Sequence, residues 1–88
     1  MAVHVGNNCV VIEGNHATIY VDTKYLCKVA KKFSFFNGFG IITESYVTPL
    51  KGNKDINVLW FSDHEFRNEA FETLSKVLVN KKGLNNFL

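Results

Sequence analysis

The sequence lacks any long apolar run. No hydrophobic stretch approaches the twenty or so residues that a membrane-spanning helix needs, and the opening residues, AVHVGNN, have neither the basic nor the apolar region of a signal peptide. Cysteine is scarce as well. Cys9 and Cys27 are the only two, and outside secreted proteins such a pair is usually two separate reduced thiols. We therefore expect a cytoplasmic protein, in the host cytoplasm if a phage encodes it, without a disulfide.

Signatures of catalysis and of metal binding are also missing. The sequence has no glycine-rich phosphate loop, nucleophile elbow or HExxH motif. His4, His16 and His64 lie far apart, and neither cysteine has zinc-ligand spacing from another ligand type. Asp63 and Glu65 flank a histidine, but carboxylates at a helix start are explained by the helix dipole. We expect no enzymatic activity, no catalytic residue, no metal and no cofactor.

What is present is the composition of one folded domain over residues 1–88. The chain is 47% hydrophobic and 14% aromatic, which is enough for a single core. The net charge is +2, too small by itself to indicate nucleic-acid binding. Lysine dominates the basic residues and asparagine is frequent, a bias typical of AT-rich coding sequences such as those of many phages.

The last third of the chain predicts a strand over residues 56–61, INVLWF, followed by an amphipathic helix over about 63–80. The apolar stripe of this helix comprises Phe66, Ala70, Phe71, Leu74, Val77 and Leu78. Its other positions hold Arg67, Asn68, Glu69, Glu72, Ser75 and Lys76. We expect the first set to face the core and the second set to face solvent.

The ends of this helix carry capping signals. Ser62 and Glu65 have the spacing of a capping box, in which each side chain accepts a hydrogen bond from the other residue's amide. Phe61 and Phe66 have the spacing of a hydrophobic staple. Gly83 is placed to end the helix.

The N-terminal part predicts a β-hairpin over residues 8–21. Gly14 and Asn15 would form a two-residue turn, which sets Glu13 opposite His16 as a surface pair. This register places on one face Val10, Ile12, Ala17, Ile19 and Val21.

The next segment, residues 22–33, predicts a short basic helix capped by Asp22 or Thr23. Its apolar residues recur at helical spacing: Leu26, Val29, Ala30 and Phe33. On the exposed side, Lys24, Lys28 and Lys31 would form one stripe. The segment is short enough to be a strand, but the lysine spacing favours a helix.

Asn37-Gly38 between apolar runs predicts a second hairpin, with Phe36 opposite Phe39 and a second strand that continues to Val47. The strand over 56–61 then returns antiparallel. The expected fold is α+β, in the order ββαβββα: a five-stranded, mostly antiparallel sheet with a short basic helix and a long C-terminal helix. Because residues 56–61 are apolar on both faces, we expect a central strand there, or a strand with one face covered by a partner.

The lysine stripe followed by an aromatic hairpin is the strongest functional signal. Lysines can neutralise phosphates while bases stack on aromatic rings. The residues predicted to contact RNA or DNA are Lys24, Lys28, Lys31, Lys32, Lys51 and Lys54. The simpler interpretation is a solvated basic helix with the phenylalanines in the core.

Residues 16–45 carry an Asp, a segment with Tyr25 and Leu26, a basic-aromatic strand, Asn37-Gly38 and FGIITES. This order resembles the small N-terminal module found ahead of the nuclease domain in phage-type HNH endonucleases. The resemblance implies DNA contact by the sheet or the helix. The catalytic histidines and asparagine of the nuclease have no counterpart, so only a binding module is implied.

The alternative function is that of a phage-encoded inhibitor or antitoxin that binds a host protein. If both helices covered one face of the sheet, then Cys9, Val11, Tyr20 and part of the row Ile56, Val58 and Trp60 would remain on the other. An apolar surface of that size indicates a homodimer or a protein partner. The anchors of such an interface would be Tyr20, Tyr46 and Trp60.

Overall fold

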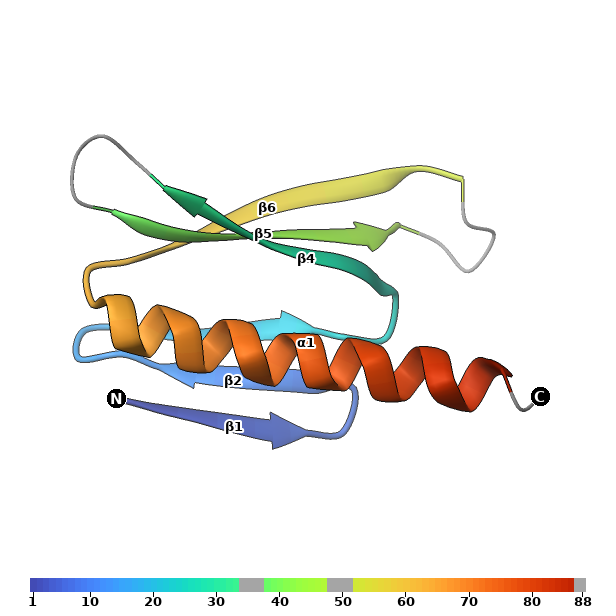
Figure 1. Ribbon diagram of the computed structural model, residues 1–88, viewed down its shortest axis with the longest axis horizontal. Coiled ribbons are helices and arrows are strands. Elements are labelled where there is room, and N and C mark those ends of the chain that lie inside the picture. Colours follow the sequence, from blue (N-terminus) through green and yellow to red (C-terminus); the bar gives the residue numbers. More distant parts are fainter. Residues whose placement is uncertain (34–37, 48–51, 87–88) are drawn as a thin grey trace.

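The computed structural model describes the backbone of residues 1–33, 38–47 and 52–86. In this part of the chain the elements are β1 (Ala2–Gly6), β2 (Cys9–Glu13), β3 (Thr18–Asp22), β4 (Leu26–Phe33), β5 (Phe39–Tyr46), β6 (Lys54–Phe61) and α1 (His64–Asn86). The strands form two separate antiparallel sheets, a first sheet β1-β2-β3 and a second sheet β4-β5-β6 (Figure 1). The prediction of one five-stranded sheet with two helices is therefore wrong, although strands and a C-terminal helix are both present.

The helix α1 runs lengthwise along the two sheets and packs against strands of both, most extensively against β4 (Figure 1). The core lies where the inner faces of the sheets meet this helix. Its buried members are Val10, Ile12, Val21, Leu26, Ile41, Phe61, Phe66, Ala70 and Leu74. The apolar stripe predicted for the helix is confirmed, because Phe66, Ala70 and Leu74 belong to this set.

The first sheet contains a strand, β1, that the sequence analysis missed. It pairs with β2 in the register Gly6 opposite Cys9, so Asn7 and Asn8 make the turn between them. Asn8 has a φ of 58°, a left-handed conformation that asparagine tolerates better than most residues. The predicted pairing of β2 with a following strand is confirmed.

The turn of that second hairpin differs from the prediction. Glu13 lies opposite Thr18, and the amide of Gly14 donates to the carbonyl of Ala17 at 2.8 Å, so four residues make the connection. The register moves by two residues, which leaves every side chain on its predicted face. The expected pair of Glu13 with His16 is replaced by a contact across the first pair of strands, where His4 Nε2 lies 3.3 Å from Glu13 Oε2.

The predicted basic helix over residues 22–33 is wrong, because this segment forms a turn and then β4. A lone helix of about twelve residues is marginal, whereas β4 gains a full ladder of bonds with β5. The register shifts by one between Leu26 and Lys28, so the strand contains a β-bulge at Cys27. The thiol of Cys27 donates to the carbonyl oxygen of Glu44, 3.2 Å away.

The second hairpin pairs Phe33 with Phe39, not Phe36 with Phe39 as expected. The Asn37 half of the predicted Asn37-Gly38 turn lies outside the described residues. The antiparallel return of residues 56–61 is confirmed, since β6 pairs with β5 along its length. However, β6 lies at the edge of the sheet and β5 is central, which corrects the expectation of a central strand there.

The helix begins with a different cap from the one predicted. Asp63 Oδ1 accepts a hydrogen bond from the amide of Glu65 at 3.0 Å, so Asp63 takes the N-cap position expected for Ser62. The staple is confirmed, because the rings of Phe61 and Phe66 meet edge to face at 5.5 Å between centroids. The helix also continues through Gly83, which was expected to end it.

Candidate nucleic-acid interface

The helical stripe predicted for Lys24, Lys28 and Lys31 is absent, because Lys24 lies in a turn and the other two lie on β4. Alternation along β4 separates them: the partners of Lys28 and Lys32 are Glu44 and Gly40, whereas Lys31 lies opposite the buried Ile41. Lys28 and Lys32 therefore point to the outer face of the second sheet, and Lys31 points to the helix side.

The remaining lysines have separate positions. Lys54 begins β6 opposite Tyr46, on the same outer face as Lys28 and Lys32. Lys24 lies in the turn before β4, with its ammonium 5.4 Å from the centre of the Tyr25 ring. On the helix side, the ammonium of Lys31 lies 4.9 Å from the centre of the Phe71 ring. Lys51 lies outside the described residues.

The outer face of the second sheet is apolar in its middle and basic at its margins. Its residues alternate with the buried Ile41, Thr43 and Phe61 along the strands. We call the following set the outer patch: Lys28, Ala30, Lys32, Gly40, Ile42, Glu44, Tyr46, Lys54, Ile56, Val58 and Trp60. Within it Ile56 is 65% exposed and Trp60 is 48% exposed.

Trp60 has a defined position in the outer patch, which we call its seat: its ring lies against Gly40. It lies opposite Gly40, and a Cβ atom added to that glycine would come within 2.9 Å of the indole ring. The ammonium of Lys32 lies 5.9 Å from the centre of a Trp60 ring. A glycine that admits an aromatic ring on one side, with a cation beside the ring, makes a flat platform open to solvent.

The charges of the outer patch are unequal. Lys28 pairs with Glu44 at 3.6 Å, and the lysine side chain remains largely exposed while the glutamate is mostly covered. Lys54 lies 5.3 Å from the centre of the Tyr46 ring. Three lysines face one carboxylate among the described residues of the patch, so its net charge is positive.

Arg67 supports the platform from the helix side and was missed by the sequence analysis, which placed it in solvent. Its side chain is 1% exposed. Nη1 donates to the carbonyl of Gly40 at 3.1 Å and to that of Lys32 at 3.4 Å, and Nε donates to Asn68 Oδ1 at 2.9 Å. The guanidinium carbon also lies 5.6 Å from the centre of the Phe39 ring. A polar residue next to an apolar stripe carries no sequence signal that would reveal such partners.

The three aromatic anchors predicted for a protein partner do not share a surface. Tyr46 and Trp60 belong to the outer patch, but Tyr20 lies on β3 opposite Val11. It is 73% exposed on the outer face of the first sheet. The structure therefore brings together two of the three residues.

The helix start does not form a site. Asp63 serves as the cap, and the ring of His64 packs against Phe39 with 5.1 Å between centroids. Across the described ranges, no three His, Cys, Asp or Glu side chains come together in a way that would hold a metal ion. No helix within residues 1–33, 38–47 and 52–86 combines the length and apolar character needed to cross a membrane.

A lysine in the C-terminal half of the helix makes hydrogen bonds to the turn that contains Lys24. Lys81 Nζ donates to the carbonyl oxygen of Thr23 at 2.8 Å and also to that of Lys24. Burial lowers the pKa of Lys81 below its ordinary value, and the charges of Asp22 and Cys27 oppose this shift. This contact fixes the chain between β3 and β4.

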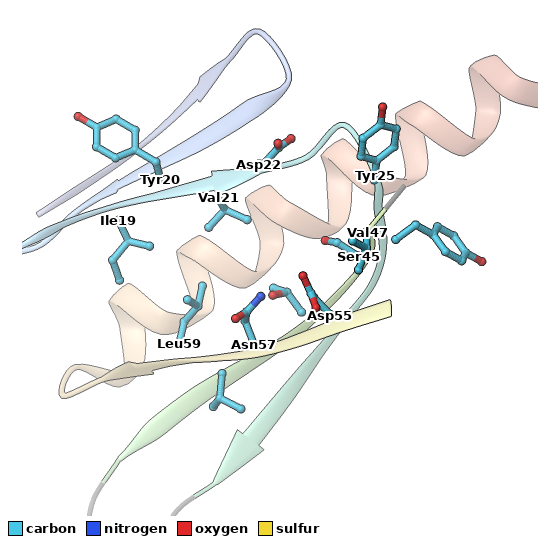
Figure 2. Close-up of a pocket in the computed structure, with 13 residues that line it drawn as sticks. Ile19, Tyr20, Val21, Asp22, Tyr25, Ser45, Val47, Asp55, Asn57 and Leu59 are labelled. Carbon is cyan, nitrogen blue, oxygen red and sulfur yellow. The ribbon is translucent and has the colours of Figure 1, made fainter. Parts of the chain in front are cut away.

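An open cleft of about 570 Å³ separates β3 from β5 and β6, on the side that the helix does not cover (Figure 2). Ile19 and Val21 point into it from β3, and Asn57 and Leu59 point back from β6. Most residues that the second sheet contributes to this cleft belong to its inner face, and the cleft shares with the outer patch only Tyr46 and Val58 among its lining residues.

No family model, no curated protein and no solved structure matches this chain. The resemblance of residues 16–45 to the nuclease module stays a prediction. The function must therefore be inferred from the chemistry of these surfaces.

Proposed function

We propose that this protein binds single-stranded nucleic acid, RNA or DNA, on the outer patch of the second sheet. The observation that carries the proposal is the seat of Trp60, an exposed indole that lies against Gly40 with the Lys32 ammonium beside it. The protein would act in the cytoplasm as a regulator, and its function would involve no catalytic step.

The chemistry of the platform favours a single strand. An unpaired base has both of its faces available, and stacking on an aromatic side chain contributes about 1–3 kcal/mol per base. A duplex keeps its bases stacked inside, so it would leave Trp60 without a partner. The apolar side chains next to Trp60, those of Ile56 and Val58, would contact the sugars and the adjacent base.

The lysines have the spacing needed to contact different phosphates. Lys28 and Lys32 lie four residues apart on one strand, which separates their Cα atoms by roughly 13 Å. Lys54 lies across the sheet on β6. Each lysine that neutralises a phosphate releases counterions, so the affinity should fall as the salt concentration rises.

The fluorescence of Trp60, the single tryptophan of the chain, provides the test. Titration with short oligo(U) and oligo(dT) should quench it, and comparison of the two separates RNA from DNA. Lys28→Ala, Lys32→Ala and Lys54→Ala should each reduce the slope of log affinity against log salt by about 0.7 for a single strand. Lys76→Ala is the matched control, because it removes one charge from an exposed position on the helix.

Glu44→Gln gives a result of the opposite sign. It removes the carboxylate that pairs with Lys28, so the affinity for the oligonucleotides should rise. The proposal is wrong if wild type shows no quenching at low salt, or if Lys76→Ala weakens binding as much as Lys32→Ala. If the protein does not bind oligonucleotides, the exposed Ile56 and Trp60 favour the alternative function, that of an inhibitor or antitoxin that binds a protein.

A further inference from the structure

Two strand edges that no other described strand pairs with border the cleft between the sheets. β3 is the last strand of the first sheet and β6 is the last strand of the second, and residues of both line the cleft (Figure 2). An unpaired edge presents main-chain donors and acceptors that another extended chain can satisfy. The volume of about 570 Å³ lies within the range of ligand-binding pockets.

The hydrogen bonds at the two ends of β3 show which main-chain groups are available. The amide of Gly14 donates to Ala17 at one end, and the amide of Thr23 donates to Asn8 at the other. In an antiparallel ladder, hydrogen-bonded pairs alternate with non-bonded pairs. The pairs Gly14–Ala17 and Asn8–Thr23 are separated by an even number of residues along each strand, so both belong to the hydrogen-bonded set. Ile19 and Val21 therefore share the phase of the pairs bonded to β2, whereas Thr18, Tyr20 and Asp22 direct their N–H and C=O groups away from β2 and toward the unpaired edge.

The side chains that line the cleft indicate which chemical class of ligand it binds. Ile19, Val21 and Leu59 make its apolar walls, and Asn57 and Asp55 supply polar groups that point inward (Figure 2). The charged residues that line the described cleft are two aspartates, and no lysine, arginine or histidine lines it. This surface repels phosphate, in contrast to the outer patch, and attracts a cation.

The two aspartates differ in availability. Asp22 lies at the rim, where Oδ1 accepts a hydrogen bond from the amide of Lys24 at 2.9 Å, and it is close enough to Lys81 for their charges to interact. Asp55 has no ion pair with another described residue, and Figure 2 shows its carboxylate directed into the cleft. Asp55 is therefore the group that would meet a cationic ligand.

We infer that the cleft binds an extended segment of a partner protein that carries apolar residues and a lysine or arginine on the same face. The segment would add to the edge of β3 as a further strand. Its apolar side chains would enter between Ile19 and Leu59, and a basic side chain would reach Asp55. This inference is independent of the nucleic-acid proposal, because the residues that it uses, Ile19, Leu59 and Asp55, do not belong to the outer patch.

The experiment uses designed peptides as probes. Their binding is measured by NMR, from the amide resonances of the isotopically labelled full chain. A capped peptide with valine and lysine at every second position, so that both lie on one face, and threonine at the positions between them should shift the amides of Tyr20 and Asp22 and slow their hydrogen exchange. The same peptide with N-methyl groups on the pairing edge should bind at least tenfold more weakly, because it lacks the donors. A peptide with glutamate in place of lysine should lose at least tenfold as well.

Asp55→Asn provides the test on the protein side. It should weaken binding of the lysine peptide several-fold, while Glu72→Gln, an exposed helix position, should leave it unchanged. Oligonucleotide quenching of Trp60 should be unaffected by Asp55→Asn, which separates the two proposals. The inference is overturned if the lysine peptide causes no shift, if the glutamate peptide binds equally well, or if concentration-dependent protection of Tyr20 in the peptide-free protein shows that a second copy occupies the edge.

Discussion

Arg67 and Trp60 approach Gly40 from opposite sides of the second sheet. The guanidinium donates to the Gly40 carbonyl at 3.1 Å from the helix side, while the indole lies against the glycine on the outer patch. The interior thus fixes the position of the strand on which the exposed ring rests.

Replacement of Arg67 by methionine should lower the free energy of unfolding by about 2 kcal/mol. The apolar side chain has a similar length, but it would remove the hydrogen bonds that the guanidinium donates to the carbonyls of Gly40 and Lys32. Arg67→Lys should recover part of the loss. Urea unfolding measures the effect, with Lys76→Met on the exposed face of the same helix as the control, expected within about 0.5 kcal/mol of wild type. Equal stability of Arg67→Met and the control would contradict this role.

Gly40→Ala should displace the Trp60 ring. The added Cβ would lie 2.9 Å from one ring carbon of Trp60 and 3.3 Å from the Cβ of Lys32, so we expect a loss of about 1–3 kcal/mol and a changed tryptophan emission. A double-mutant cycle identifies the cause. In a Trp60→Ala background the cost of Gly40→Ala should fall by at least about 1 kcal/mol. An unchanged cost would mean that the ring is not what restricts position 40.

Asp63→Ala should destabilise the protein more than Ser62→Ala. Asp63 accepts the hydrogen bond from the Glu65 amide, and loss of an N-cap costs about 1 kcal/mol. Ser62 is exposed and should change stability by less than about 0.5 kcal/mol. Thermal unfolding of the two variants compares them directly, and the reverse ranking would restore Ser62 as the cap.

Lys81 should make stability depend on pH in the alkaline range. Its folded-state pKa is lowered by burial, so between that pKa and 10.5 the unfolded chain holds a proton that the folded chain has released. This contribution to the free energy of unfolding therefore grows as pH rises through the lowered pKa toward 10.5, and it is absent at lower pH. Lys81→Met should flatten this part of the profile. A side-chain NMR titration that gives Lys81 a pKa of 10.5 or higher would contradict it.

The C-terminal third of the fold could be predicted because its signals are local. Phe66, Ala70 and Leu74 repeat with the helical period, and Phe61 lies at the staple position beside them. The cap was assigned one residue too early because Ser62 and Asp63 are both capping residues and the sequence does not rank them. The strand β6 was predicted from its apolar residues. Its position at the edge of the sheet was not, because it depends on how distant strands of the chain pair with one another.

The strand β4 could not be recognised because the spacing of Leu26, Val29 and Phe33 fits a helix and also fits a strand interrupted by a bulge. This one error joined two sheets into one and arranged the lysines as a stripe. Three of the lysines predicted to bind nucleic acid, Lys28, Lys32 and Lys54, share one surface with Trp60, which was predicted as an anchor for a protein partner. Their shared face depends on strand alternation, which a helical interpretation cannot provide.

The bulge at Cys27 decides which side of the protein is basic. Before it Leu26 is buried opposite Ser45, and after it Lys28 and Lys32 point outward. A continuous ladder from Leu26 would reverse every later position, which would turn both lysines toward the core and expose Val29. A change that flattened the bulge with Cys27 still in the chain would therefore turn the strand inside out, whereas deletion of Cys27 would join Leu26 directly to Lys28 and leave both lysines facing outward.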